Sequence, residues 1–323
     1  MDKRSLRACA LPAAALALSL LAACLPSGQR DDAPSGAPKD TAAPASPRPV
    51  ASEASGRGAA PGAPASPPPL PEMVRAEAGA FVMGSEDGAA DERPAHRVRI
   101  ARDLLVAVRK VTAEEYDRFC DETGRARPKS RLGFDGSRLP AIGVDWYDAV
   151  AYCDWLSRLH GLAPCYSGEG LKTACDFGAS GYRLPTEAEW EWAARGGRLS
   201  KGFRWAGSDD PLAVAWFGEN SQGAMREVGL LGPNELGLYD MSGNLYEWCW
   251  DFYGRDYYAA SPEIDPEGPP PGRPATPRGP EHSRRAGSWR EGRESVRVAF
   301  RSLDNAGYPG DNGFRLFRTA PSE

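Results

Sequence analysis

The sequence predicts a single α+β domain of short helices, strands and many loops. Three segments begin with a helix cap followed by apolar residues at helical spacing. In a fourth, Val296, Val298 and Phe300 alternate with Arg297, Ala299 and Arg301, as in a half-buried strand. Composition agrees, since 36 Gly and 30 Pro in 323 residues favour turns over long helices, and nine Trp can fill a core.

The first 24 residues resemble a bacterial lipoprotein signal peptide. A positively charged start precedes an apolar run at 10–21 that is too short to span a bilayer, and Leu-Ala-Ala-Cys ends at Cys24 like a lipobox. The alternative is an ordinary cleaved signal with an incidental cysteine. Lipid on Cys24 would anchor the protein in the cell-envelope membrane. Leu25 in place of an aspartate favours the outer membrane.

Residues 25–72 are predicted to be a disordered tether. This stretch of 48 positions holds 12 Pro and 11 Ala and almost no large apolar side chain, so it cannot offset the entropy of ordering. The folded domain is expected at 73–319. The net charge of the whole chain, −5, gives no indication of the basic surface that nucleic acid requires, so no DNA or RNA partner is expected.

Three helices are expected from their caps. Thr112 and Glu115 form a capping box before a helix that ends near Gly124, and Asp145 caps a second helix that continues to Gly161. Both are assigned to packing. The third helix begins with the Thr186–Glu189 capping box, stops at Gly196, and gathers on one side Ala188, Trp192 and Ala193.

Several dense motifs carry a family resemblance. They are GYRLPTEAEWEWAARGG at 181–197, GLYDMSGNLYEW at 237–248, RAGSW at 285–289 and GFR at 313–315. Over roughly 74–318 the chain resembles the formylglycine-generating-enzyme (sulfatase-modifying factor) family. The resemblance implies one irregular domain of C-type-lectin-like architecture, with short helices, a twisted antiparallel sheet and many loops.

The segment that carries copper chemistry in this family departs from the pattern. The oxidases hold Cu(I) with two cysteine thiolates between the positions of Trp289 and Arg301. Here the segment 290–295 reads Arg-Glu-Gly-Arg-Glu-Ser, and no cysteine follows Cys249. Cys249 could supply one ligand, but between two tryptophans it is more simply a packed residue. Copper is therefore not expected.

The GLYDMSGNLYEW segment matches a calcium loop of the family. The resemblance implies that a structural Ca²⁺ is held by side chains and carbonyls of Asp240, Gly243, Leu245 and Glu247. Such a turn can direct oxygen ligands at about 2.3–2.6 Å toward a hard cation. The alternative is that Asp240 and Asn244 stabilise a tight turn while Glu247 pairs with an arginine.

The cysteines and arginines leave further alternatives. With Cys24 lipidated, five cysteines remain in an oxidising compartment, and we expect a disulfide between Cys165 and Cys175 across a hairpin turn. Cys120 and Cys153 either pair or stay buried as thiols, and Cys249 is left over. A possible groove for an anionic partner is formed by Arg285, Trp289, Arg297, Arg301 and Arg315; otherwise these arginines make buried ion pairs.

Three functional hypotheses follow. The first is an envelope-tethered, non-catalytic module that binds an unknown protein, peptide or glycan. The second is an enzyme, an oxidoreductase, that uses this scaffold for other chemistry, because related domains occur in sulfoxide synthases and in siderophore maturation. The third is a copper-dependent formylglycine-generating oxidase. The three histidines lie in separate segments and show no zinc or non-haem iron spacing.

Overall fold

The computed structural model describes residues 68–129, 136–272 and 277–321, all within one compact unit, Ala63–Glu323. The predicted signal peptide, Cys24 and the tether up to residue 67 lie outside the described residues. Among the helices that are described, none has the length and apolar character needed to cross a bilayer.

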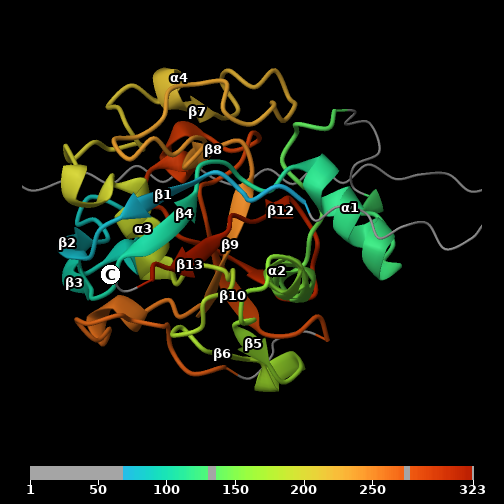
Figure 1. Cartoon of the computed structure of the whole chain (residues 1–323). Coiled ribbons are helices and arrows are strands. Elements are labelled where there is room, and N and C mark those ends of the chain that lie inside the picture. Colours follow the sequence, from blue (N-terminus) through green and yellow to red (C-terminus); the bar gives the residue numbers. More distant parts are fainter. Residues whose placement is uncertain (1–67, 130–135, 273–276, 322–323) are drawn as a thin grey trace, which may run out of the picture. The chain divides into compact units, whose positions relative to one another are not determined.

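The strands form several small sheets (Figure 1). One sheet has the order β1-β4-β13, and another has the order β11-β10-β9-β12, in which β12 runs parallel to β9. Two-stranded ladders join β2 to β3, β5 to β6, and β7 to β8. The bounds are β1 Met73–Ala76, β2 Gly79–Met83, β3 His96–Ile100, β4 Leu104–Ala107, β5 Tyr166–Ser167, β6 Ala174–Cys175, β7 Ala215–Trp216, β8 Ser242–Gly243, β9 Tyr246–Phe252, β10 Glu281–Arg285, β11 Ser302–Asn305, β12 Asn312–Gly313 and β13 Phe317–Thr319.

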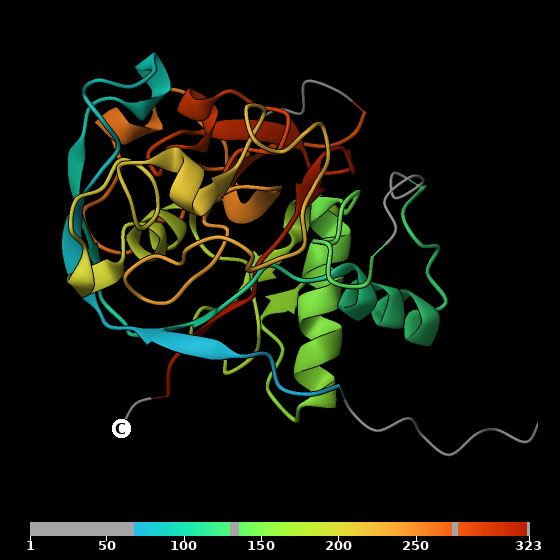
Figure 2. The ribbon, with the colours of Figure 1, turned by 90° about the horizontal axis from the view of Figure 1, so that it is seen from above.

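Short helices complete the α+β fold and confirm the predicted class. The α-helices are α1 Ala113–Thr123, α2 Trp146–Leu159, α3 Glu187–Ala194 and α4 Pro211–Val214. Single 3₁₀ turns lie at η1 Ala90–Glu92, η3 Gly170–Lys172, η4 Gly197–Leu199, η5 Tyr257–Ala259 and η6 Arg293–Val296. Helices α1 and α2 lie side by side at one edge of the domain in both views (Figures 1 and 2).

The predicted caps start the helices. Glu115 N donates to Thr112 Oγ1, and Glu115 Oε2 accepts from Thr112 N at 2.7 Å, closing the capping box of α1. Asp145 Oδ1 accepts from Asp148 N at 2.8 Å and begins α2. Helix α1 ends at Gly124 because its φ of 71° lies in the left-handed region that glycine adopts without strain.

Helix α3 is buried on every side, which the pattern of apolar residues did not indicate. All eight of its residues are buried, including Glu187, Glu189 and Glu191. The helix packs against β2, β3, β9 and β10. A helix so enclosed keeps carboxylates inside only if each one meets a cationic or hydrogen-bonding partner.

The strand expected at 296–301 is wrong. The chain forms the 3₁₀ turn η6 up to Val296, and β11 begins only at Ser302. The alternation is real, since Val296 and Val298 are buried, but Arg297 and Arg301 are buried as well. A period of two marks a half-buried strand only when its polar positions face water, and here they face buried carboxylates.

Residues 68–72, assigned to the tether by composition, contact the domain. Val108 N donates to Glu72 O at 2.9 Å, and a ring nitrogen of His160, just beyond α2, donates to Pro68 O at 2.9 Å. Figure 2 shows the chain entering beside the end of α2 before it forms β1. The ordered part of the protein therefore begins before residue 73.

Candidate functional site

Glu247 on β9 is the centre of a buried ionic cluster. Lys110 Nζ donates to its Oε1 at 2.6 Å, Arg315 Nη2 donates to the same oxygen at 2.9 Å, and Trp190 Nε1 donates to Oε2 at 2.7 Å. The side chains of Lys110, Arg315 and Glu247 are all fully buried. Burial raises the pKa of Glu247, but Arg315 and Lys110 outweigh it and hold the pKa at about 2.

Two other members of the predicted calcium loop, Asp240 and Gly243, make hydrogen bonds within the protein. Asp240 Oδ2 accepts from Gly229 N at 2.8 Å, and its Oδ1 accepts from Asn244 Nδ2 at 3.4 Å. The Gly243 carbonyl accepts from Leu245 N at 2.9 Å. No cluster of three or more His, Cys, Asp or Glu side chains suited to a metal occurs in the described part of the chain.

Glu247 does not fit a calcium ion. A cation beside it would have to displace the ammonium of Lys110. The geometry instead matches the alternative drawn from the sequence, with Asp240 and Asn244 in a tight turn and Glu247 paired with an arginine. Lys110, which the sequence did not single out, supplies the second positive charge.

A second ionic cluster surrounds the carboxylates of α3. Arg285 pairs with Glu187 at 2.9 Å and with Glu191 at 2.5 Å, and Arg301 pairs with Glu187 at 2.7 Å. Burial raises the pKa of Glu187, but Arg301 and Arg285 together hold it at about 2. Both glutamates point into the core from the same helix.

The structure contradicts the possible groove for an anionic partner. Its residues are 0–7% exposed, and the set is Arg285, Trp289, Arg297, Arg301 and Arg315. Arg297 pairs with Glu92 at 2.7 Å, so each of the four guanidinium groups already has a buried carboxylate partner. These arginines are integral to the core and do not form a binding surface.

The segment at the position of the copper cysteines is a polar surface loop. The guanidinium of Arg290 lies 4.2 Å from the centroid of the Trp289 ring and pairs with Asp311 at 3.3 Å. Arg293 Nε donates to Glu219 at 2.9 Å. Guanidinium and carboxylate groups cannot replace the thiolates that Cu(I) prefers.

Cys249 does not supply a thiolate ligand for copper in place of the missing cysteines. It is fully buried in the core cluster around α3, and burial first, then Glu187, raises the pKa of its thiol well above the ordinary value. A protonated thiol enclosed on all sides is neither a copper ligand nor a nucleophile.

The expected disulfide between Cys165 and Cys175 is not formed. All five described cysteines are free: Cys120, Cys153, Cys165, Cys175 and Cys249. The predicted hairpin is present, but Tyr166 pairs with Cys175, while Asp176 N donates to Cys165 O. The two cysteines are therefore offset by one position, and neighbouring positions of a ladder point to opposite faces. Cys120 and Cys153 are buried thiols.

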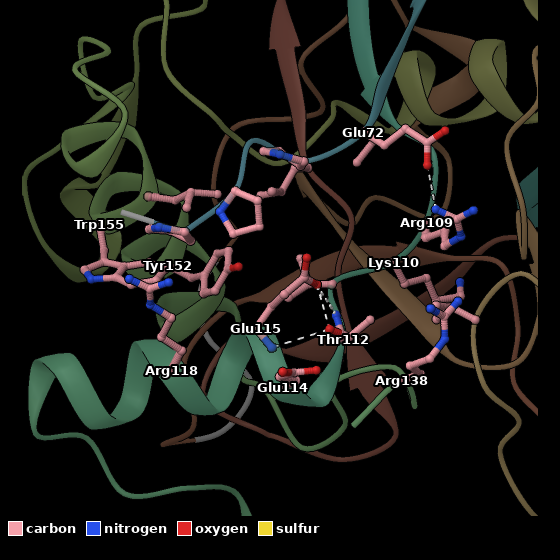
Figure 3. A pocket seen from close by; sticks show the side chains of 18 residues that line it. Glu72, Arg109, Lys110, Thr112, Glu114, Glu115, Arg118, Arg138, Tyr152 and Trp155 are labelled. Carbon is pink, nitrogen blue, oxygen red and sulfur yellow. Dashed lines mark hydrogen bonds and ion pairs between the residues drawn. The ribbon is translucent and has the colours of Figure 1, made fainter. Parts of the chain in front are cut away.

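A pocket that the sequence did not predict lies beside α1 and α2 (Figure 3). Its volume is about 480 Å³, within the range of ligand sites. The walls come from the entering segment, the chain after β4, and the facing sides of α1 and α2. From composition, the entering segment was predicted to belong to the tether, and both helices were assigned to packing alone. The pocket therefore could not be predicted from the sequence, because only the tertiary fold brings these segments into contact.

The comparisons with known proteins agree with this fold. The family model described as "Sulfatase-modifying factor enzyme 1-like domain" matches residues 59–320. The chain is 33% identical over 263 residues to serine/threonine-protein kinase pkn1 of Chlamydia pneumoniae, covering 74% of this chain but only 36% of that protein. It is 31% identical over 257 residues to formylglycine-generating enzyme of Streptomyces coelicolor, covering 68% and 81% of the two chains.

A solved structure shares this fold. Treponema denticola variable protein 1 superposes with a TM-score of 0.66 at 30% identity, over 77% of this chain and 95% of that one. The family match extends over most of the chain and includes every motif on which the resemblance was based. The chain therefore belongs to the family of sulfatase-modifying factor enzyme 1-like domains.

Proposed function

We propose that this protein is a lipid-anchored module of the bacterial cell envelope whose domain binds a partner without generating formylglycine. The observation that carries the proposal is the segment 290–295, which has no sulfur and whose arginines pair with surface carboxylates. Cys249, the thiol nearest along the sequence, is buried and protonated. Two-coordinate Cu(I) then has no thiolate pair to bind.

The anchoring part of the proposal is based on the sequence. Cys24 follows Leu-Ala-Ala, and the Pro- and Ala-rich residues after it would hold the domain away from the membrane. Leu25 after the lipidated cysteine supports the outer membrane as the destination. The partner would be a protein, peptide or glycan of the envelope.

An oxidation assay tests the non-catalytic part. The full-length chain is incubated with Cu(I), oxygen and a Cys-Xaa-Pro-Xaa-Arg peptide, and the aldehyde is measured by mass spectrometry. We expect no aldehyde above the level of a copper-only control. Aldehyde formed in proportion to the protein would overturn the proposal. In a separate metal analysis of the purified protein, a redox metal bound at one equivalent would favour the oxidoreductase alternative.

Metabolic labelling tests the anchor. Cells that express the full-length chain are given radioactive palmitate, and their membranes are fractionated by density. We expect label in the protein in the outer-membrane fraction and its loss in Cys24→Ser. An unlabelled wild-type protein released to the soluble fraction would contradict lipid anchoring, while label in the inner membrane would contradict only the destination.

A further inference from the structure

The pocket between α1 and α2 combines an apolar floor with a charged rim (Figure 3). The floor includes Val111, Leu156 and Leu316, all buried. Charged side chains of both signs surround it, and Pro68, Pro69 and Pro71 of the entering segment close one side. An apolar floor with a few polar groups is the usual composition of a ligand site.

The positive charges of the pocket are already matched. Arg109 pairs with Glu72 at 2.7 Å, Arg118 with Glu122 at 2.7 Å, and Arg138 with Glu227 at 3.6 Å. The ammonium of Lys110 is buried in the core, where it pairs with Glu247. An anionic ligand would have to compete with these carboxylates for each cation.

In the first turn of α1, one carboxylate and one oxygen of a second carboxylate have no partner among the described residues. The side chain of Glu114 is exposed and has no ion-pair or hydrogen-bond partner among the described residues. Glu115 uses only Oε2 for the capping box, through Thr112 N at 2.7 Å and Thr112 Oγ1 at 2.8 Å. The charge left without a counterion at the rim is therefore negative.

Tyr152 provides a second, independent indication of a ligand. The residue is only 3% exposed, its ring packs against Tyr116, Phe119 and Trp155, and no described residue hydrogen-bonds its hydroxyl. Figure 3 shows the hydroxyl turned from α2 toward Glu115. The hydroxyl is not among the enclosed polar atoms that lack a partner, so it opens into the pocket, where water or a ligand can hydrogen-bond with it.

We propose that this pocket binds a basic side chain, lysine or arginine, presented by a polypeptide partner. The aliphatic stem would lie on the apolar floor, while the charged head would donate hydrogen bonds to Glu114, Glu115 and the hydroxyl of Tyr152. Neutral glycans would leave both carboxylates without a counterion. The inference rests on the proposed function and names the chemical class of the partner.

Calorimetric titration of the full-length chain with a blocked peptide tests this site. The probe is acetyl-Ala-Ala-Lys-Ala-Ala-amide, and its control has norleucine in place of lysine, which keeps the stem but removes the charge. We expect the lysine peptide to bind at least tenfold more tightly, because charge-assisted hydrogen bonds are lost in the control. Equal affinity for the two peptides, or no binding of either, would overturn the proposal.

Variants assign the binding to this pocket. Glu114→Gln and Tyr152→Phe should each weaken the lysine peptide about five- to tenfold, because each removes one interaction with the charged head. Asp121→Asn is the matched control, since it removes one carboxylate from the same helix away from the pocket lining. Thermal unfolding of every variant checks that the fold is intact. If Asp121→Asn weakened binding as much as Glu114→Gln, the effect would be one of general charge, and the assignment of the binding site to this pocket would be wrong.

This test is independent of the oxidation assay. Oxidation of the peptide by the protein would contradict the non-catalytic proposal but would say nothing about ligand binding in the pocket. Failure of the lysine peptide to bind would contradict the pocket proposal but would not affect the argument from the missing copper ligands.

Discussion

The buried clusters around Glu187 and Glu247 use the same residue types as the rim of the pocket, but to opposite effect. In the core, Arg285, Arg301 and Arg315 satisfy carboxylates that have no access to water. At the rim, Glu114 and one oxygen of Glu115 find no partner among the described residues. Charge that is fully matched within the protein specifies the fold, whereas unmatched charge at a cavity is available to a ligand.

The largest expected effect comes from breaking the core cluster. Glu247→Gln should lower the free energy of unfolding by about 3–5 kcal/mol, because it leaves Lys110 and Arg315 buried without a countercharge. The measurement is urea unfolding followed by tryptophan fluorescence. Glu72→Gln at the pocket rim is the control, and it should cost about 0.2–1 kcal/mol because its partner Arg109 is solvated. Equal losses in the two variants would erase the distinction between the regions.

Acid should destabilise the core clusters next. The pKa values of Glu187 and Glu247 are about 2 in the folded protein against an ordinary value of 4.5. Groups whose pKa is lowered by folding stabilise fully above 4.5, and that stability is lost as pH falls from 4.5 toward 2. Each carboxylate should contribute about 3 kcal/mol to the loss. Glu187→Gln should flatten the dependence of unfolding free energy on pH in that window, and an unchanged slope would contradict the assignment.

The role of Lys110 as the cation beside Glu247 can be tested by substitution and by a chelator. Lys110→Met should cost about 2 kcal/mol, less than Glu247→Gln, because Glu247 keeps Arg315 and Trp190 as partners.

The wild-type melting temperature should not change when EDTA is added, since the ammonium occupies the place of a cation. A chelator-dependent drop in melting temperature that calcium reverses would show that an ion binds after all.

The smallest effect on stability is expected at Tyr152. Tyr152→Phe should change the unfolding free energy by less than about 0.5 kcal/mol, because the lost hydroxyl makes no hydrogen bond with a described residue. The matched variant in the core is Tyr258→Phe, whose hydroxyl accepts from Arg285 at 3.2 Å. That change should cost about 1.5–3 kcal/mol, as for a buried hydrogen bond to a charged group. Both are read from chemical unfolding, and a larger loss at Tyr152 than at Tyr258 would reverse the comparison.

Features encoded by neighbouring residues were predictable. The caps at Thr112, Asp145 and Thr186 placed the starts of three helices, because a cap and its partner are three residues apart. The strand at 296–301 failed because its polar positions face buried carboxylates such as Glu187, from far along the chain. The disulfide failed because the register of β5 against β6, which the hairpin alone did not reveal, separates Cys165 from Cys175.

The sequence by itself determined the family, the starts of the helices and the lack of sulfur after Cys249, because these depend on residue identity and short spacing. Only the tertiary structure decided which charges are matched. Lys110 and Glu247 are separated by 137 positions and meet at 2.6 Å, and the pocket joins segments from Pro68 to Leu316. Such pairings follow from how the whole chain packs, since the same glutamate is costly or stabilising according to the partner that packing brings to it.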